Sequence, residues 1–207
     1  ATTHVLNHGL HYGSCVFEGL RVYSSKIYKL EQHTDRLFHS ANRMGIEVPY
    51  TKNELNDAQE QIINKMNITY GYIRPVIWRG SEMMAISAQK NKINVAIATW
   101  EWPSYFSPED RLKGLTLQTA EWRRPPANTI PTDAKAAGLY MICTLSKHKA
   151  EKDGFTDALM LDYEGKVAES TGSNIFFVFN GELHTPIPHC FLDGITRQTA
   201  ISIAEKQ

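Results

Sequence analysis

The middle of the chain places a lysine among small apolar residues. Lys135 lies in the segment IPTDAKAAGLY of residues 130–140, at the predicted start of a long helix. Burial and the positive end of a helix dipole both disfavour an ammonium group, so these surroundings favour the neutral amine. A neutral amine can attack an aldehyde and form a Schiff base. The competing interpretation, which this segment alone favours, is an exposed lysine in a first helical turn, because most lysines are exposed.

Two segments near the end of the chain carry a carboxylate and a possible anion-binding turn. Glu169 follows the apolar pair Val167-Ala168, so we expect a buried carboxylate that needs a partner; an edge-strand glutamate is the alternative. Gly194 opens the predicted helix that continues through Thr196, and free backbone N–H groups with a threonine hydroxyl suit a phosphate. Helix starts of this kind are common, so this signal is weak by itself.

The strand predicted over residues 70–80 carries Tyr72 and Arg74 at a spacing of two, which places both side chains on one face. A phenol beside a guanidinium suits a carboxylate ligand, through a hydrogen bond and a bidentate ion pair. A solvated strand face is the competing interpretation.

Three histidines near the beginning have helical spacing. His4, His8 and His11 could in principle ligate a metal, and a metal-dependent hydrolase would follow. No carboxylate or cysteine nearby completes a ligand set, so we expect no metal.

The periodicity of the chain predicts the elements that position these residues. An ordered connector rich in aromatic residues and prolines is expected over residues 100–109, between a domain of residues 1–99 and a domain of residues 110–207. The first domain is predicted to contain a hairpin over 20–30, helices over 32–44 and 51–66, a strand over 70–80 and a buried strand over 93–98. The second is predicted to contain a strand near 115–117, a helix ending at 153–154, and buried strands over 158–161 and 174–179.

Composition excludes several classes of protein. Lys+Arg and Asp+Glu number 22 each, so no net charge attracts nucleic acid, and no apolar run has the length of a membrane span. Cys15, Cys143 and Cys190 are odd in number and far apart, which indicates reduced thiols and a cytoplasmic protein. The two ends of the chain indicate a part of a longer polypeptide.

Taken together, the motifs resemble the branched-chain amino-acid aminotransferases, a group of fold-type IV pyridoxal phosphate enzymes. The resemblance implies an α+β fold with a small α/β N-terminal domain and a larger, β-barrel-like C-terminal domain that is incomplete here. Members of the family begin somewhat before Ala1 and continue past Gln207. The motifs that carry the resemblance are HGLHYG from His8, VFEG from Val16, HxxRL from His33, YIRP from Tyr72, AKA from Ala134 with Gly138 and Tyr140, AES from Ala168 with Gly172 and Asn174, and GITR from Gly194.

The resemblance implies the residues that bind pyridoxal 5′-phosphate. Lys135 is the implied Schiff-base lysine and catalytic residue, and Glu169 the implied partner of the pyridine nitrogen. Tyr140 is expected to hydrogen-bond the ring oxygen. Arg36 and the turn Gly194-Ile195-Thr196 are expected to hold the phosphate.

The resemblance also implies a substrate pocket. Tyr12, Phe17 and Trp102 are expected to line it, and Tyr72 and Arg74 to bind substrate carboxylates.

The implied reaction is transamination between L-leucine, L-isoleucine or L-valine and 2-oxoglutarate, with ping-pong kinetics. The implied partners are these amino acids and 2-oxo acids and a second copy of the chain, as a homodimer or higher homo-oligomer, with no nucleic acid and no membrane. Three alternatives stay open: a D-amino-acid aminotransferase, an aminodeoxychorismate lyase, and a non-catalytic, truncated family member.

Overall fold

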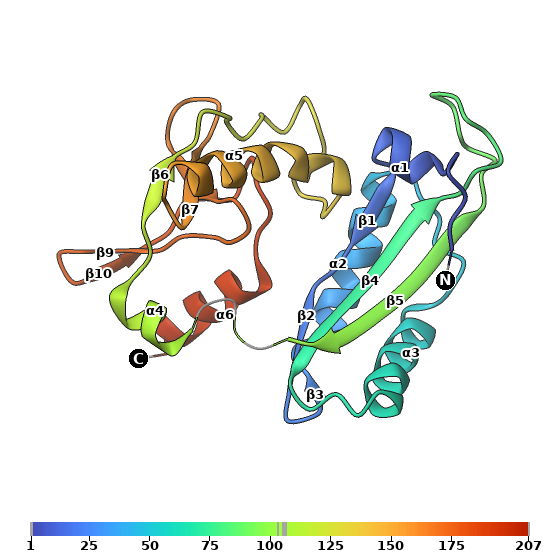
Figure 1. Cartoon of the computed structure of the whole chain (residues 1–207), viewed down its shortest axis with the longest axis horizontal. Helices are drawn as coiled ribbons and strands as arrows, with labels where there is room; N and C mark the ends of the chain where they lie inside the picture. Colours follow the sequence, from blue (N-terminus) through green and yellow to red (C-terminus); the bar gives the residue numbers. More distant parts are fainter. Residues whose placement is uncertain (1, 103, 105–106, 207) are drawn as a thin grey trace. The chain divides into compact units, whose positions relative to one another are not determined.

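The structure is a computed structural model that describes residues 2–102, 104 and 107–206. The chain forms two compact units, one of residues 1–104 with 134–138 and one of residues 105–133 with 139–207 (Figure 1). The division after residue 104 falls inside the expected connector of residues 100–109, of which Pro103, Tyr105 and Phe106 lie outside the described residues. Residues 134–138 belong to the first unit, although the expected boundaries assign them to 110–207.

The first unit is built on an antiparallel sheet of five strands with β4 at its centre (Figure 1). The strand β5 runs along one edge of β4, while β1 and β2 follow each other along the other edge and β3 pairs with β2. The strands are β1 (Cys15–Phe17), β2 (Leu20–Tyr23), β3 (Lys26–Ile27), β4 (Gly71–Arg79) and β5 (Ile93–Glu101). The predicted hairpin and both predicted long strands are therefore present.

Three helices belong to this sheet: α1 (His8–Tyr12), α2 (Leu30–Arg43) and α3 (Lys52–Lys65). The capping box predicted at Thr51 and Glu54 opens α3, since each residue's side chain accepts the other's backbone N–H. The helix α2 contacts both α3 and β1. The core of the unit consists of Leu20, Val22, Ile63, Ile68 and Ile73.

The strands β1 and β2 behave as one strand with a short interruption. The pairs Phe17–Val76 and Leu20–Ile73 keep a single register along β4 on both sides of the gap. Residues 15–22 alternate between half-buried and buried throughout, which is the pattern of a continuous strand with one face on the core.

A proline explains why the strand is interrupted at Glu18. The backbone N–H of Glu18 donates to the Pro75 carbonyl at 3.0 Å. Facing residues of a hydrogen-bonded antiparallel pair normally exchange two such bonds, but proline has no N–H to return the second. The sheet therefore loses one ladder bond where β1 ends.

The second unit combines short sheets with helices. The strand β6 pairs in parallel with β7, and β8 pairs antiparallel with β7, while β9 and β10 form a separate hairpin. The helix α5 lies between β6 and β7 in the chain and contacts β7. The elements are α4 (Pro108–Lys113), β6 (Leu117–Thr119), α5 (Met141–Lys152), β7 (Asp157–Leu161), β8 (Val167–Ser170), β9 (Phe177–Phe179), β10 (Glu182–His184) and α6 (Ile195–Ala204).

Three sequence predictions about strands, one in the first unit and two in the second, are wrong in detail. The strand predicted as buried over 93–98 is β5, which has no buried residue because, among the described residues, it pairs on one side only, with β4. It also continues to Glu101, so Trp100 and Glu101 belong to the sheet and not to the connector. The strand predicted near 115–117 begins at Leu117. The strand predicted as buried over 174–179 is β9, whose three residues are all exposed because its only strand neighbour in the described part of the chain is β10. No helix in the described ranges is long and apolar enough to cross a lipid bilayer.

Candidate active site

The backbone of Lys135 is held in an extended conformation against the first unit's sheet. Ala136 forms an antiparallel bridge with Val16. The Lys135 carbonyl accepts the Phe17 N–H at 3.1 Å, and the Lys135 N–H donates to the hydroxyl of Ser40, on α2, at 2.9 Å. The half-buried side chain places Nζ 4.9 Å from the centre of the Phe17 ring.

This position corrects the prediction that Lys135 begins a helix. A 3₁₀ helix starts only at Ala137 (Ala137–Tyr140), and α5 follows it. The helix-dipole argument for a neutral amine therefore loses its basis, and the half-buried position against an aromatic ring remains.

Tyr72 and Arg74 lie on one face of β4, as their spacing predicts. Arg74 Nη2 donates to the Tyr72 hydroxyl at 2.9 Å. The guanidinium carbon lies 4.5 Å from the centre of the Phe17 ring, so Lys135 and Arg74 contact the same ring. Arg74 Nε is buried and has no hydrogen-bond partner, and no carboxylate among the described residues forms an ion pair with Arg74. This cation is therefore available to an anionic ligand.

An aromatic cluster continues from Tyr72. Its ring centre lies 5.0 Å from that of Trp100 and 4.9 Å from that of Trp102, and the two indoles stack at 5.6 Å. The structure thus groups the predicted pocket residue Trp102 with Tyr72, and it adds Trp100, which the sequence analysis assigned to the connector. A Cβ on Gly19 would lie 1.8 Å from the Tyr72 hydroxyl, so only glycine leaves room for this phenol.

Tyr12 does not belong to this cluster. It lies in α1, is 46% exposed, and stacks on His8 with ring centres 4.6 Å apart. The ring nitrogens of His8 lie 2.6 Å from the Ser14 hydroxyl and 2.8 Å from the Ala85 carbonyl, which accounts for this buried histidine without a metal.

Arg36 binds a carboxylate that the sequence analysis gave no role. Glu18 is fully buried and accepts hydrogen bonds from Arg36 Nε at 2.6 Å, Arg36 Nη2 at 3.0 Å and His33 Nδ1 at 2.7 Å. His33 and Arg36 are three residues apart on α2, and this spacing is the one signal in the sequence that pointed to a shared partner.

These contacts determine the charge of Glu18. Burial by itself would raise the pKa of the carboxyl group, but the hydrogen bonds from His33 and Arg36 and the charge of Arg36 outweigh it and lower the pKa to about 2. Glu18 is therefore a carboxylate at neutral pH.

In the second unit, Glu169 is buried, as its sequence context predicts. It lies in β8 with 9% of its surface exposed. Glu169 Oε1 lies 3.4 Å from Arg124 Nε and forms an ion pair with it. The geometry of this contact is not that of a hydrogen bond. Oε2 accepts the Asn174 side-chain N–H at 3.2 Å. The carboxylate is thus held between a guanidinium and an amide.

Asn174 joins Glu169 to the turn that opens α6. Its Nδ2 also donates to the Leu192 carbonyl at 3.1 Å, and its Oδ1 accepts the Gly194 N–H at 3.1 Å. A Cβ on Gly194 would lie 2.1 Å from that Oδ1, so the amide requires glycine at this position. Asn174 accompanies the AES motif in the sequence, but no function was predicted for it.

The remaining predicted residues lie near these groups in the chain. Gly194 is the N-cap of α6, Ile195 is buried and Thr196 is exposed in its first turn. Tyr140 is half-buried at the end of the 3₁₀ helix, directly before α5.

The predicted site residues therefore fall into two sets, one in each unit. The first set is Tyr12, Phe17, Arg36, Tyr72, Arg74, Trp102 and Lys135, and the second is Tyr140, Glu169, Gly194, Ile195 and Thr196.

Comparison with known proteins gives one consistent family. The amino-transferase class IV family matches residues 15–207. The chain is 46% identical to a probable branched-chain-amino-acid aminotransferase of Rickettsia bellii (strain RML369-C), over 99% of this chain and 70% of the relative. It is 41% identical to the branched-chain-amino-acid aminotransferase of Pseudomonas aeruginosa, over 99% of this chain and 68% of the relative.

Solved structures agree. The branched-chain aminotransferase from the thermophilic archaeon Thermoproteus uzoniensis, solved with norvaline, superposes with a TM-score of 0.93 at 35% identity, covering 100% of this chain and 70% of that one. The branched-chain amino acid aminotransferase from Escherichia coli gives 0.91 at 35% identity, covering 100% and 68%. The chain therefore belongs to the class IV aminotransferase family, among its branched-chain-amino-acid aminotransferases.

Proposed function

We propose that the chain transfers the amino group of L-leucine, L-isoleucine or L-valine to 2-oxoglutarate, with pyridoxal 5′-phosphate as cofactor. The observation that carries this proposal is the pairing of Lys135 and Arg74 on the Phe17 ring. One group is a primary amine, and the other is a half-buried guanidinium whose buried Nε has no hydrogen-bond partner and which has no anionic partner in the described residues. An amine for the carbonyl and a guanidinium for a carboxylate are what an amino or 2-oxo acid requires.

The groups of this chain fit the cofactor. Similar proteins have been solved with pyridoxamine 5′-phosphate, in a structure that gives a TM-score of 0.96 at 38% identity, and with PLP. We assign Lys135 Nζ to the aldehyde carbon and the buried, negatively charged Glu169 to the protonated ring nitrogen. The N–H groups at the start of α6 (Gly194, Ile195 and Thr196), together with Arg36, suit the phosphate, and Tyr140 suits the ring oxygen.

When bound, the cofactor withdraws the bonding electrons at the substrate's α-carbon into its ring. Glu169 keeps the proton on the ring nitrogen, because a carboxylate stabilises the adjacent positive charge. Lys135 Nζ, as the free amine, would take the α-proton of the bound substrate. Arg74 and the Tyr72 hydroxyl bind a substrate carboxylate, and the aromatic rings of Phe17 and Trp102 favour apolar side chains.

Two whole-enzyme properties complete the proposal. We propose a homodimer or higher oligomer, tested by size-exclusion chromatography at several concentrations, where a stable monomer would count against it. We place the enzyme in the cytoplasm, because its three cysteines are odd in number and far apart in the sequence.

The deciding experiment is the visible spectrum of the purified protein before and after borohydride, with Lys135→Ala as the comparison. We expect a yellow band that borohydride reduces onto the peptide containing Lys135, and no such label in the variant. A protein that stays colourless after addition of pyridoxal phosphate would support a non-catalytic family member. Turnover of L-leucine but not D-alanine separates the proposed reaction from a D-amino-acid aminotransferase, and amino transfer to 2-oxoglutarate separates it from a lyase.

A further inference from the structure

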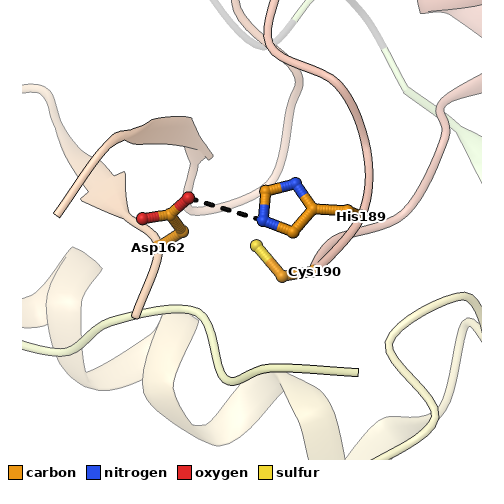
Figure 2. Close-up of side chains that lie close together, drawn as sticks. All are labelled: Asp162, His189 and Cys190. Atoms are coloured by element: carbon orange, nitrogen blue, oxygen red, sulfur yellow. Dashed lines mark ion pairs between the residues drawn. The ribbon is translucent and has the colours of Figure 1, made fainter. Parts of the chain in front are cut away.

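Asp162, His189 and Cys190, none of which has a role in the site described above, converge in the second unit (Figure 2). Asp162 follows β7 directly, and the other two residues lie between β10 and α6. One carboxylate oxygen, one imidazole nitrogen and the thiol sulfur lie within 4.8 Å of one another. Figure 2 shows the imidazole edge and the thiol both directed at the carboxylate, with the Asp162–His189 contact dashed.

The carboxylate is fixed so that one oxygen remains for this cluster. Asp162 is 1% exposed, and its Oδ1 accepts the backbone N–H groups of Glu164 at 3.0 Å and Lys166 at 2.8 Å. Its Oδ2 faces His189 Nε2 at 3.5 Å. Within the described ranges no lysine or arginine forms an ion pair with Asp162, so Oδ2 of this buried carboxyl group faces the cluster without a lysine or arginine partner.

The imidazole presents a lone pair to the same point. His189 Nδ1 lies 3.0 Å from the Ile187 carbonyl, which can only accept, so Nδ1 carries the proton. In the neutral ring Nε2 is then an acceptor that faces a carboxylate oxygen, and two acceptors at this distance repel unless a proton or a metal ion lies between them. A histidine that donates its other N–H to a carbonyl is the usual arrangement of a metal ligand.

We propose that Asp162, His189 and Cys190 bind a zinc ion, with water as the fourth ligand. Mixed nitrogen, sulfur and oxygen donors suit zinc, whereas calcium and magnesium take oxygen ligands. Tetrahedral zinc with bonds of about 2.0–2.1 Å holds nitrogen and oxygen ligands about 3.3 Å apart, close to the 3.5 Å found here. Because the His189 side chain is 45% exposed, water reaches the open position.

Binding displaces the proton of the Cys190 thiol to solvent, since thiolate is the metal-binding form. The ion then fastens residues 189–190 to the end of β7. Gly194, at the start of α6, lies only four residues further along the chain, so the ion fixes the base of that turn.

The test uses purified holoenzyme treated with chelator, dialysed, and equilibrated with Zn²⁺ at micromolar free concentration. We expect one zinc per chain by mass spectrometry of the metal content. Cobalt substitution should add a thiolate-to-metal charge-transfer band in the difference spectrum. Cys190→Ala should abolish the band, and His189→Gln should weaken zinc binding by more than about tenfold, the loss that even an outer partner of a metal ligand causes.

Two variants control for other groups. Cys15→Ala removes a thiol of the first unit, and His184→Gln removes an exposed histidine that also lies 3.5 Å from a carboxylate, Glu182, but lacks a cysteine nearby. Both should bind one zinc as the parent does. Substoichiometric zinc in the parent, or equal binding by His189→Gln or Cys190→Ala, would overturn the proposal and leave an ordinary histidine–aspartate ion pair. Because His189 is exposed, its variant is expected to fold, and far-ultraviolet circular dichroism verifies this.

Discussion

Two neighbouring residues of the first unit, on the interrupted strand formed by β1 and β2, contact different groups on the two faces of the sheet. Glu18 and Phe17 are neighbours on the interrupted strand, and their side chains point to opposite faces of the sheet. Glu18 is fully buried and binds Arg36 and His33 on α2, while Phe17 contacts Lys135 and Arg74. The strand therefore fixes the amine and the phosphate-binding candidate Arg36 through adjacent residues.

The burial of Glu18 leads to a prediction about stability. Its folded pKa of about 2 lies below the ordinary value of 4.5, so the stabilisation is fully present above pH 4.5 and is lost as pH falls towards 2. Glu18→Gln should lower the free energy of unfolding at neutral pH by about 3 kcal/mol, because it leaves the Arg36 side chain, only 15% exposed, without its counter-charge. Urea unfolding followed by tryptophan fluorescence measures the change.

The pH dependence identifies the cause. The difference in free energy of unfolding between the parent and Glu18→Gln should decrease as pH falls from 4.5 towards 2. Glu31→Gln, an exposed change on α2, should leave the free energy of unfolding nearly unchanged. A gap that stays constant over this range would show that packing, and not the carboxylate charge, is responsible.

At the scale of the elements, local pattern predicted most of the first unit. Alternation and helical periodicity gave β2, α2, α3 and β4, and the capping box placed the start of α3 correctly. The segment around Lys135 was misassigned because alanines favour helix locally, whereas the bridge from Ala136 to Val16 is a tertiary interaction that propensity does not contain. The exposed strand β9 was misassigned for a related reason, since an apolar run does not say what covers it.

In the candidate site, too, local sequence predicts some features and tertiary contacts determine others. Residue types and motifs predicted Lys135, Glu169, Tyr72 and Arg74 as candidates, but Ser40, which accepts the Lys135 N–H, and Arg124, which pairs with Glu169, are distant in the sequence. The ion pair of Arg124 with Glu169 exists only through the fold, in which β8 is paired with β7.

The hydrogen bonds of Asn174 to Glu169 on β8 and to Gly194 at the start of α6 lead to a prediction about an element. Gly194→Ala should destabilise the unit by roughly 1–3 kcal/mol, because its Cβ would collide with the Asn174 oxygen 2.1 Å away. In an Asn174→Ala background this oxygen is absent, so the same glycine change should cost little more. The free energies of unfolding of the parent, the two single variants and the double variant complete this double-mutant cycle. The affinity of the four proteins for pyridoxal phosphate should follow the same order.

Gly172→Ala is the matched control, because nothing lies within 4 Å of a Cβ there. Equal costs of Gly194→Ala with and without Asn174 would show that backbone conformation, and not the amide, requires this glycine.

For the molecule as a whole, the equal numbers of positive and negative side chains mean that anionic substrates must be recognised by individual groups in the site. Positive and negative side chains number 22 each, so no long-range field concentrates amino or oxo acids. Arg74, a half-buried guanidinium that forms no ion pair with the described carboxylates, is then the group expected to distinguish a dicarboxylate from an apolar amino acid.

Steady-state kinetics test whether both substrates use this one site. The proposed reaction alternates between two half-reactions on the same lysine, so double-reciprocal plots for leucine at several 2-oxoglutarate concentrations should be parallel. Arg74→Met should raise the KM for 2-oxoglutarate by roughly 10–100-fold, the loss of a charged hydrogen bond of about 1.5–3 kcal/mol, with a smaller effect on leucine. Arg111→Met, an exposed change on α4, should alter neither constant. Intersecting lines would contradict a shared site, because they require both substrates to be bound together, and an equal loss for both substrates would assign Arg74 to the α-carboxylate that leucine and 2-oxoglutarate have in common.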